Sequence, residues 1–293
     1  MKKIIVTGAN GQLGNEFRNI AGQTSSYQFF FFDRNGLNIG DPDEVNRCFR
    51  ESRPDYVINC AAFTAVDRAE TEMESALLIN RDGAAYLATA ASNYGARFIH
   101  FSTDYVFDGT SDTPLKEEAA TDPVNAYGQS KLEGEPRVTQ ANHDAVILRT
   151  SWVYSVYGNN FVKTMLRLMA SRPEIGVVAD QMGSPTYAAD LAGATLQIVD
   201  ALTWSSGIYH YSNEGVISWY DFATQIKQLS GASCTIRPLT TDQYPTPAKR
   251  PLFSVMDKTK IQQVYGIQIK DWKESLQLCL QKLNKDLQTA RSA

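Results

Sequence analysis

The sequence predicts an α/β fold, with a doubly wound parallel sheet followed by a smaller C-terminal α/β domain. Short apolar runs without polar alternation, typical of strands covered on both faces, alternate with segments of helical character. Before residue 151 these runs are Lys3–Thr7, Phe29–Phe32, Asp55–Ala62, Arg97–Phe101 and Ala145–Thr150. No repeat of another kind interrupts them, and this order is typical of a parallel sheet with helices on both faces.

The regular alternation weakens after Thr150, which indicates a second domain. We expect residues 1–155 to form the first domain and residues 156–293 to form the second. Segments within about 175–215 are expected to return to the first domain, because Ile208–Tyr211 has the character of another strand. No low-complexity linker separates the halves, so the second domain should pack tightly on the first.

Composition narrows the classes of function. The chain has 293 residues, of which 43% are hydrophobic and 20% charged, as in an ordinary globular protein with a sizeable core. A net charge of -4 argues against nucleic acid as a partner. No run of about 18 apolar residues occurs, so no membrane span is expected. The apolar part of Met1–Gly8 is too short for a signal peptide, and we expect a cytoplasmic location.

A glycine-rich turn directly follows the first predicted strand. Its sequence is Gly8-Ala-Asn-Gly11-Gln-Leu-Gly14, and the helix-like Asn15–Ala21 comes next. Strand, glycine turn and helix form the context in which Rossmann-like folds bind dinucleotides. Glycines let the backbone approach a pyrophosphate, and the free N–H groups at the start of the helix bind the anion. The turn therefore predicts a dinucleotide cofactor.

Two residues at the end of the second strand bear on which cofactor is bound. Asp33 and Arg34 lie about 20 residues beyond the glycine turn, where such folds place the residue that contacts the adenosine ribose. Asp33 suits the 2′-hydroxyl of NADH and Arg34 suits the 2′-phosphate of NADPH, so both cofactors stay open. Asp41 is a candidate for the adenine end, and an equal alternative is that it caps a helix starting at Pro42.

A Tyr-x-x-x-Lys pair carries the predicted chemistry. Tyr127 and Lys131 share one face of a helix that Thr121 or Asp122 would cap, and Thr103 ends an earlier strand. Tyr127 would donate a proton to a carbonyl oxygen as a hydride is added, Lys131 would hold the nicotinamide ribose, and Thr103 would orient the substrate. A phenol has a pKa near 10, and we expect Lys131 and the oxidised nicotinamide to lower that of Tyr127 toward about 7.

These motifs together resemble the extended short-chain dehydrogenase/reductase family over nearly the whole chain. The segments that carry the resemblance are Gly8–Gly14, Asn59–Glu70, Ser102–Gly109, Tyr127–Lys131, Arg149–Tyr154, Gly158–Phe161 and Asp180–Thr186. The resemblance implies a Rossmann-like first domain and NADPH- or NADH-dependent reduction of the 4-keto group of a dTDP-sugar. It also implies that Thr103, Tyr127 and Lys131 are the catalytic groups.

The resemblance further implies the binding residues. Those for the cofactor are Gly8, Asn10, Gly11, Gln12, Leu13, Gly14, Ala61, Ala62, Thr64, Tyr127 and Lys131. Those for the substrate are Thr103, Asp104, Trp152, Asn160 and Arg250. The alternative for Trp152 is a core position between the domains. Phe63 stands where the family often has tyrosine, which removes one cofactor hydrogen bond but no catalytic group.

Other functions and features stay open. Some relatives of this fold bind a dinucleotide as regulatory subunits, such as the β subunit of methionine adenosyltransferase, which need no proton donor. Epimerases and dehydratases form a third class, and dehydratases usually carry acids near the catalytic threonine, where this chain has Asp104. Some relatives dimerise around Mg²⁺, for which Glu16 and Asp190 are candidates here. His100 lies in an apolar run and is interpreted as a core residue.

Overall fold

Six parallel strands form the central sheet of the computed structural model, which describes the backbone of residues 1–292 and the side chains of residues 1–285. The strands are β1 (Lys2–Thr7), β2 (Tyr27–Phe32), β3 (Tyr56–Asn59), β4 (Arg97–Thr103), β5 (Val146–Thr150) and β10 (Gly207–His210). Their order is β10-β5-β4-β3-β1-β2, and every neighbouring pair is parallel. The predicted α/β fold is confirmed, including the late strand near residue 208.

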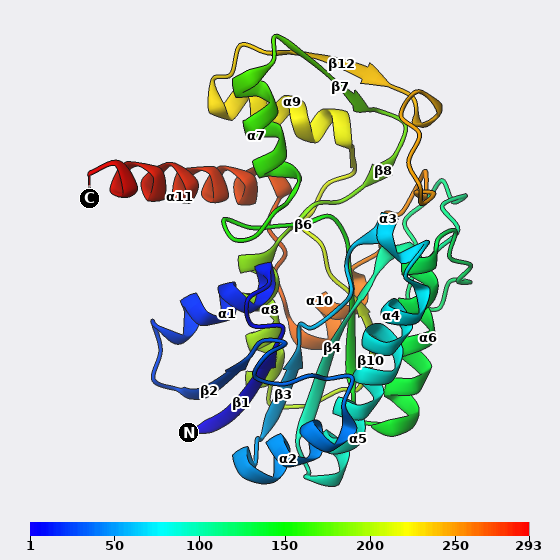
Figure 1. Ribbon diagram of the computed structural model, residues 1–293, viewed down its shortest axis with the longest axis vertical. Coiled ribbons are helices and arrows are strands. Elements are labelled where there is room, and N and C mark those ends of the chain that lie inside the picture. The colour runs from blue at the N-terminus through cyan, green and yellow to red at the C-terminus, as the bar shows by residue number, and fades with distance from the viewer. Residues whose placement is uncertain (293) are drawn as a thin grey trace.

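Helices cover both faces of this sheet (Figure 1). One face carries α1 (Gln12–Ala21) and α8 (Ala188–Asp200), and the other carries α2 (Pro42–Ser52), α5 (Ala84–Asn93) and α6 (Ala126–Ala141). Alternate residues of β1 serve two separate cores, because Ile4 and Val6 pack toward α1 and α8 whereas Ile5 packs toward α2 and α5. A strand that is buried on both faces requires the uninterrupted apolar sequence seen here.

The helical stretch before α5 is irregular. α3 (Val66–Ala69) and α4 (Met73–Leu77) come first, and a π-helical segment, η1 (Leu78–Gly83), joins α4 to α5. Asn80 in this segment accepts a hydrogen bond from the Phe63 N–H at 2.8 Å and donates to Ser130 Oγ at 2.9 Å. Asn80 thereby ties the loop after β3 to α6, and π-helical turns often occur beside functional sites.

The second half of the chain builds a separate apolar core beyond the carboxyl ends of the strands (Figure 1). Its main elements are α7 (Phe161–Ser171), β7 (Glu174–Val178), α9 (Trp219–Ser230), β12 (Thr235–Leu239) and α11 (Trp272–Ser292). Three two-stranded pairs belong to this half: β7 with β12, β6 (Val153–Tyr154) with β9 (Thr186–Tyr187), and β8 (Met182–Gly183) with β11 (Ile217–Ser218). Among the described helices, none is both long and apolar enough to cross a membrane.

The boundaries of the two domains stay a prediction, and the apolar cores support them in part. Within the range 175–215, α8 and β10 pack with the central sheet, but β7 belongs to the second core. α10 (Thr259–Tyr265) lies in the range assigned to the second domain, yet its Ile261 belongs to the core on the sheet.

The order of the strands reverses beside β1. The chain passes from β1 to β2 on one side and then to β3 on the other side. In open α/β sheets, ligands bind at such a reversal, in the crevice outside the carboxyl ends of the strands. The elements of the second core lie beyond this same edge of the sheet (Figure 1).

Candidate active site

A cavity of about 760 Å³ lies at the carboxyl edge of the sheet. It is lined by most of the residues that the sequence predicted: Gly8, Asn10, Gly11, Gln12, Leu13, Gly14, Asp33, Arg34, Ala61, Ala62, Thr64, Thr103, Asp104, Tyr127, Lys131 and Trp152. Asp41, Asn160 and Arg250 are not among its lining residues. The volume lies in the range of small-molecule sites.

The glycine turn leaves no room for a side chain at Gly8 or Gly14. Gly8 has φ +63°, and a Cβ there would lie 2.6 Å from the Ala61 nitrogen. A Cβ on Gly14 would lie 2.5 Å from the Gly8 carbonyl oxygen. Gly11 precedes α1 and supplies no side-chain cap, so the first N–H groups of the helix are available to an anion. The turn therefore fits the pyrophosphate of a dinucleotide.

Asp33 and Arg34 line the same end of the cavity but differ in their partners. The Asp33 carboxylate accepts from Asn10 Nδ2 at 2.7 Å and from the N–H groups of Asn35 and Gly36 at 3.0 Å. Arg34 has no hydrogen bond or ion pair within the described residues. Because the Asp33 carboxylate holds the turn together, Arg34 is the charged group that remains available at this end.

Asp41 acts as a helix cap, which was the alternative assignment. Its carboxylate accepts from the N–H groups of Asp43 at 2.9 Å and Glu44 at 3.2 Å at the start of α2. Leu37, Asn38 and Ile39 line the cavity in its place. The one signal in the sequence that this segment lines the cavity was the apolar pair Leu37 and Ile39. The structure buries both residues, and such a pair is equally typical of a core.

The helix with the Tyr-x-x-x-Lys pair starts later than predicted. α6 begins at Ala126 and is capped by Asn125, whose Oδ1 accepts from the Gly128 N–H at 2.7 Å. The prediction of a cap at Thr121 or Asp122 was wrong, because the loop continues to a residue that is itself a strong N-cap. A Cβ on Gly128 would lie 2.2 Å from the Tyr105 carbonyl oxygen, so the start of α6 packs directly on the turn after β4.

Tyr127 is held as a neutral phenol. Burial raises the pKa of Tyr127 to about 12, a hydrogen bond with Thr103 opposes this rise, and the charge of Asp104 adds to it. Lys131 is not among the groups that shift this pKa in the protein alone, so the lowering toward 7 by Lys131 together with the oxidised nicotinamide stays a prediction. A protonated phenol is the state that a proton donor requires.

Thr103 connects Tyr127 with Asp104. The Thr103 hydroxyl donates to Asp104 Oδ1 at 3.1 Å and accepts from the Tyr105 N–H at 3.2 Å. Burial raises the pKa of Asp104 to about 7. Asp104 Oδ2 is buried and has no hydrogen-bond partner among the described residues. Since buried polar atoms normally have a partner, this oxygen suits a hydroxyl group of a bound ligand.

Lys131 is buried at the base of the cavity. It is 2% exposed, and its Nζ donates to the Phe101 carbonyl oxygen at 2.6 Å. Burial lowers the pKa of Lys131 to about 8, and the charge of Glu135 opposes this shift. A lysine without a carboxylate in contact is rarely buried so deeply, and the cavity beside it is the place where ribose hydroxyls would meet it.

An aromatic pair forms the wall on the side of the second core. The rings of Trp152 and Trp219 stack with centroids 3.5 Å apart and an interplanar angle of 10°, and both line the cavity. Trp152 has φ +47°, which is rare for a bulky residue, and a Cβ on Gly183 would lie 2.6 Å from its ring. Strained residues of this kind are common at binding sites. Trp219 was not predicted, and its one signal is an aromatic residue directly after the helix cap Ser218.

Asn160 supports the cavity from outside its wall. Its Oδ1 caps α7 by accepting from the Lys163 N–H at 3.1 Å, and its Nδ2 donates to Gln12 Oε1 at 2.9 Å and to the Ser155 carbonyl at 2.7 Å. These bonds engage both the oxygen and the nitrogen of the amide, and the contact with substrate stays a prediction. The neighbouring Asn159 lines the cavity instead.

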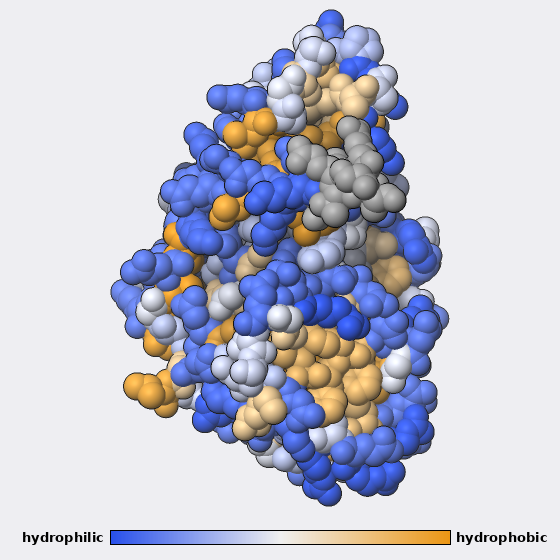
Figure 2. All heavy atoms as spheres, turned by 90° about the vertical axis from the view of Figure 1, so that its left-hand side faces the viewer, coloured by the Kyte–Doolittle hydropathy of each residue, from blue (hydrophilic) through white to orange (hydrophobic). Residues whose placement is uncertain are grey.

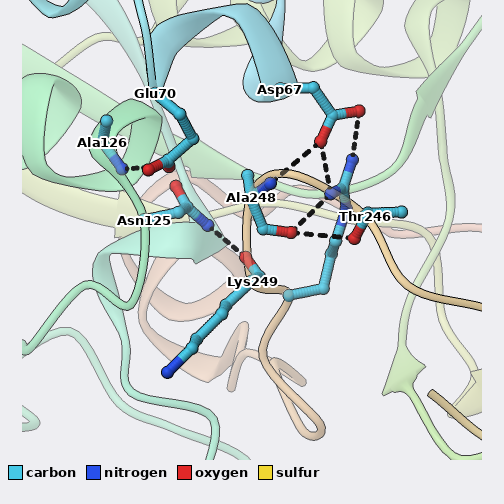
Figure 3. A network of polar contacts seen from close by, with 8 residues as sticks. Asp67, Glu70, Asn125, Ala126, Thr246, Ala248 and Lys249 are labelled. Carbon is cyan, nitrogen blue, oxygen red and sulfur yellow. Dashed lines mark hydrogen bonds and ion pairs between the residues drawn. The ribbon is translucent and has the colours of Figure 1, made fainter. Parts of the chain in front are cut away.

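Arg250 pairs with Asp67 and is not among the residues that line the cavity; Figure 3 shows Asp67 in this network of polar contacts. Its guanidinium donates to the Asp67 carboxylate at 2.6 and 3.0 Å and to the Ala248 carbonyl at 2.6 Å. Beside it, Asn125 donates to the Lys249 carbonyl at 2.8 Å. Asp67 belongs to α3, so these contacts join the loop after β3 to the late segment of the chain. The arrangement makes Arg250 a tie between the two halves, and its contact with the substrate stays a prediction.

Glu16 and Asp190 do not form a metal site in the described part of the chain. No group of three or more His, Cys, Asp or Glu side chains suited to a metal ion occurs among the described residues. Glu16 accepts from Ser155 Oγ at 2.7 Å, and Asp190 accepts from Lys270 Nζ at 2.8 Å and Asn213 Nδ2 at 3.0 Å. Because protein groups already satisfy both carboxylates, the expectation of Mg²⁺ finds no support.

Known proteins are similar to this chain over nearly its whole length. A family model described as the RmlD substrate binding domain matches residues 1–285. A dTDP-4-dehydrorhamnose reductase from Aggregatibacter actinomycetemcomitans is 43% identical over 286 residues, which covers 94% of this chain and 97% of that protein.

Solved structures agree with this match. A dTDP-4-dehydrorhamnose reductase from Clostridium acetobutylicum superposes with a TM-score of 0.93 at 42% identity, covering 96% of this chain and 99% of that one. A dTDP-4-dehydrorhamnose reductase from Bacillus anthracis, solved in complex with NADP, gives a TM-score of 0.91 at 39% identity, covering 96% and 100%.

Proposed function

The chain belongs to the family described as the RmlD substrate binding domain, and from this membership we propose that it reduces the C4 ketone of dTDP-4-dehydrorhamnose. The product is dTDP-rhamnose, and NADPH or NADH is the reductant. The observation that carries the proposal is that one cavity is lined by the glycine turn together with Thr103, Tyr127 and Lys131. A module that only binds a dinucleotide has no need for a buried proton donor there.

Tyr127, Thr103 and Lys131 have separate roles in the reduction. When bound, the nicotinamide supplies the hydride. Tyr127 donates its proton to the carbonyl oxygen as negative charge develops on it, and the Thr103 hydroxyl orients that oxygen. Lys131 holds the ribose hydroxyls and, in its charged form, stabilises the phenolate left on Tyr127. Tyr127 regains its proton from water before the next turnover.

The opposite wall is suited to the sugar nucleotide. Trp152 and Trp219 present an aromatic surface toward the cavity, and Asp104 Oδ2 is available to a sugar hydroxyl. A cytoplasmic location is part of the proposal, since the substrate and the cofactor are both polyanions that membranes retain. A homodimer stays a prediction.

Turnover with both cofactors tests the proposal. The loss of absorbance of reduced nicotinamide should follow addition of dTDP-4-dehydrorhamnose, with NADPH or NADH in separate reactions. The matched control is dTDP-glucose, which lacks a ketone and should leave the reduced cofactor unconsumed. Dinucleotide binding without turnover of the ketone by either cofactor would favour the regulatory class and contradict the proposal.

We further propose that Arg34 receives the 2′-phosphate of NADPH. Arg34 lines the cavity and has no partner among the described residues. Arg34→Ala is expected to raise the Kd for NADPH about tenfold and to leave the Kd for NADH nearly unchanged, because a charged hydrogen bond contributes about 1.5–3 kcal/mol. The control is Arg50→Ala on the exposed face of α2, which should change neither constant. Equal losses for the two cofactors would show that Arg34 does not contact the 2′-phosphate.

A further inference from the structure

A row of polar side chains crosses the sheet beneath the cavity. Thr7 on β1, Asn59 on β3 and His100 on β4 are register partners on neighbouring strands, and each is 1% exposed. The Thr7 hydroxyl donates to Asn59 Oδ1 at 2.7 Å, and Asn59 Nδ2 lies 3.0 Å from His100 Nδ1. His100 Nε2 lies 3.4 Å from Lys131 Nζ. The residue interpreted from the sequence as core therefore links the sheet to the proposed active site.

The hydrogen bonds determine which ring nitrogen of His100 carries the proton. The Ala61 backbone N–H can only donate, and it meets Asn59 Oδ1 at 3.1 Å. Asn59 Nδ2 is therefore the group that faces His100, and His100 Nδ1 accepts from it. If the Asn59 amide were turned round, two donors would face each other at Ala61. Neutral His100 consequently carries its proton on Nε2.

This Nε2–H group faces the Lys131 amine. Two N–H donors cannot bond to each other, so the ammonium form of Lys131 gains nothing from His100, whereas the neutral amine can accept from it. Within the described residues, the remaining partner of Lys131 Nζ is the Phe101 carbonyl at 2.6 Å. Burial lowers the pKa of His100 well below its usual value, and the charge of Lys131 adds to this, so His100 stays neutral.

We infer that His100 is a positioning residue, which governs the charge of Lys131 through the tautomer that Asn59 imposes. The inference deepens the proposed function and rests on it, because it concerns the lysine placed at the nicotinamide ribose. Burial lowers the pKa of Lys131 to about 8. The His100 N–H that faces the amine therefore determines up to which pH above neutrality Lys131 keeps its charge. The rate of reduction then depends on pH through a residue that touches neither substrate nor cofactor.

The other charged groups around Lys131 do not replace this effect. On α6, Glu135 favours the ammonium, but its carboxylate is bound to Arg149 at 2.7 Å. Tyr127, one turn earlier, is neutral, and Asp104 on the turn after β4 acts on Tyr127. On η1, Arg81 pairs with Asp82 and Glu133. Among these neighbours, His100 is therefore the one side chain on the sheet whose N–H group faces the lysine.

Nitrogen NMR of protein labelled with ¹⁵N-histidine reads the tautomer directly. The chain has three histidines, and His100→Phe or His143→Gln assigns the ring signals. His210 is an internal reference of the opposite tautomer, because its Nδ1 lies 3.1 Å from the Asp257 carbonyl and must donate to it. We expect Nε2–H at His100 and Nδ1–H at His210. A proton on His100 Nδ1, or on both of its nitrogens near neutral pH, overturns the inference, and this reading needs no turnover.

The pH profile of kcat tests the effect on Lys131. In the wild type the rate should fall as Lys131 loses its proton near pH 8. His100→Phe removes the donor, and His100→Gln offers an amide oxygen to the ammonium, so both should move this fall to higher pH by about half a unit or more.

The inference is overturned if the pH at which kcat falls is unchanged or lower in both His100 variants. If the wild type does not reduce the ketone, the same titration is read from the pH dependence of NADPH binding. A failure of the proposed reaction is thereby distinguished from a failure of the role of His100. If neither variant folds, the tautomer of His100 measured in the wild type determines whether the inference holds.

Discussion

Replacing Tyr127 with phenylalanine is expected to lower kcat by at least about a hundredfold, which is the usual share of acid catalysis, while NADPH still binds. The change removes one hydroxyl and keeps the ring, which packs edge-on against Tyr105 with centroids 6.0 Å apart. The lost group is the hydroxyl, which burial keeps protonated beside Thr103. Single-turnover rates with saturating cofactor and substrate would measure the loss at the chemical step.

Tyr105→Phe is the matched control for this prediction. Tyr105 lines the same cavity, and burial raises its pKa as well, but it is not proposed to donate a proton. We expect the control to lose less than about tenfold in kcat, because it contributes at most a hydrogen bond. Near-normal turnover by Tyr127→Phe, or an equal loss in both variants, would contradict the assignment of Tyr127.

Removal of the Glu135 carboxylate is expected to destabilise the protein by about 3–5 kcal/mol, the usual effect of breaking a buried ion pair. Glu135 on α6 accepts from Arg149 Nε at 2.9 Å and Nη2 at 2.7 Å, and from Ser102 Oγ at 2.6 Å. The side chains of Arg149 and Glu135 are 3% and 4% exposed. In Glu135→Ala the Arg149 charge stays buried without its partner, and the urea midpoint of unfolding would report the loss.

Glu133→Ala, on the same helix, is the control. Glu133 pairs with Arg81 at 3.2 Å, but its side chain is 34% exposed, so the loss should be at most about 1 kcal/mol. If the two variants unfolded at the same urea concentration, water would have to reach the Arg149–Glu135 pair. That outcome would contradict the tight packing of α6 against β4 and β5.

The features that could be predicted from the sequence are those with local causes. The run Lys3–Thr7 is apolar at every position from Ile4 to Val6, which is what a strand covered on both faces needs. Gly8 and Gly14 are glycines because backbone atoms of neighbouring segments occupy the space of a Cβ. The place of Tyr127 and Lys131 on one helix face follows from their spacing alone.

Other features depend on partners far away in the chain. Arg250 has the chemistry of a diphosphate ligand, and without substrate its guanidinium pairs with Asp67. Asn160 has the chemistry of a sugar ligand, and without substrate its amide nitrogen donates to Gln12 and to the end of the preceding loop. Asn125 outcompeted Thr121 and Asp122 as the cap of α6, and all three are good capping residues. Residue type indicates what a side chain can bind, and distant neighbours decide what it does bind.

The sequence by itself predicted the parallel sheet, the turn that fits a pyrophosphate, and the three groups proposed for catalysis, because the pattern of apolar runs and the spacing and order of the motifs can be seen along the chain. Only the tertiary structure decided the proton state of those groups. The pKa of Tyr127 rises and that of Lys131 falls because burial removes water from both, which no local pattern reveals. The packing of α6 on β4 brings Lys131 to His100, and the hydrogen bond from Asn59 on β3 determines which ring nitrogen carries the proton that faces the lysine.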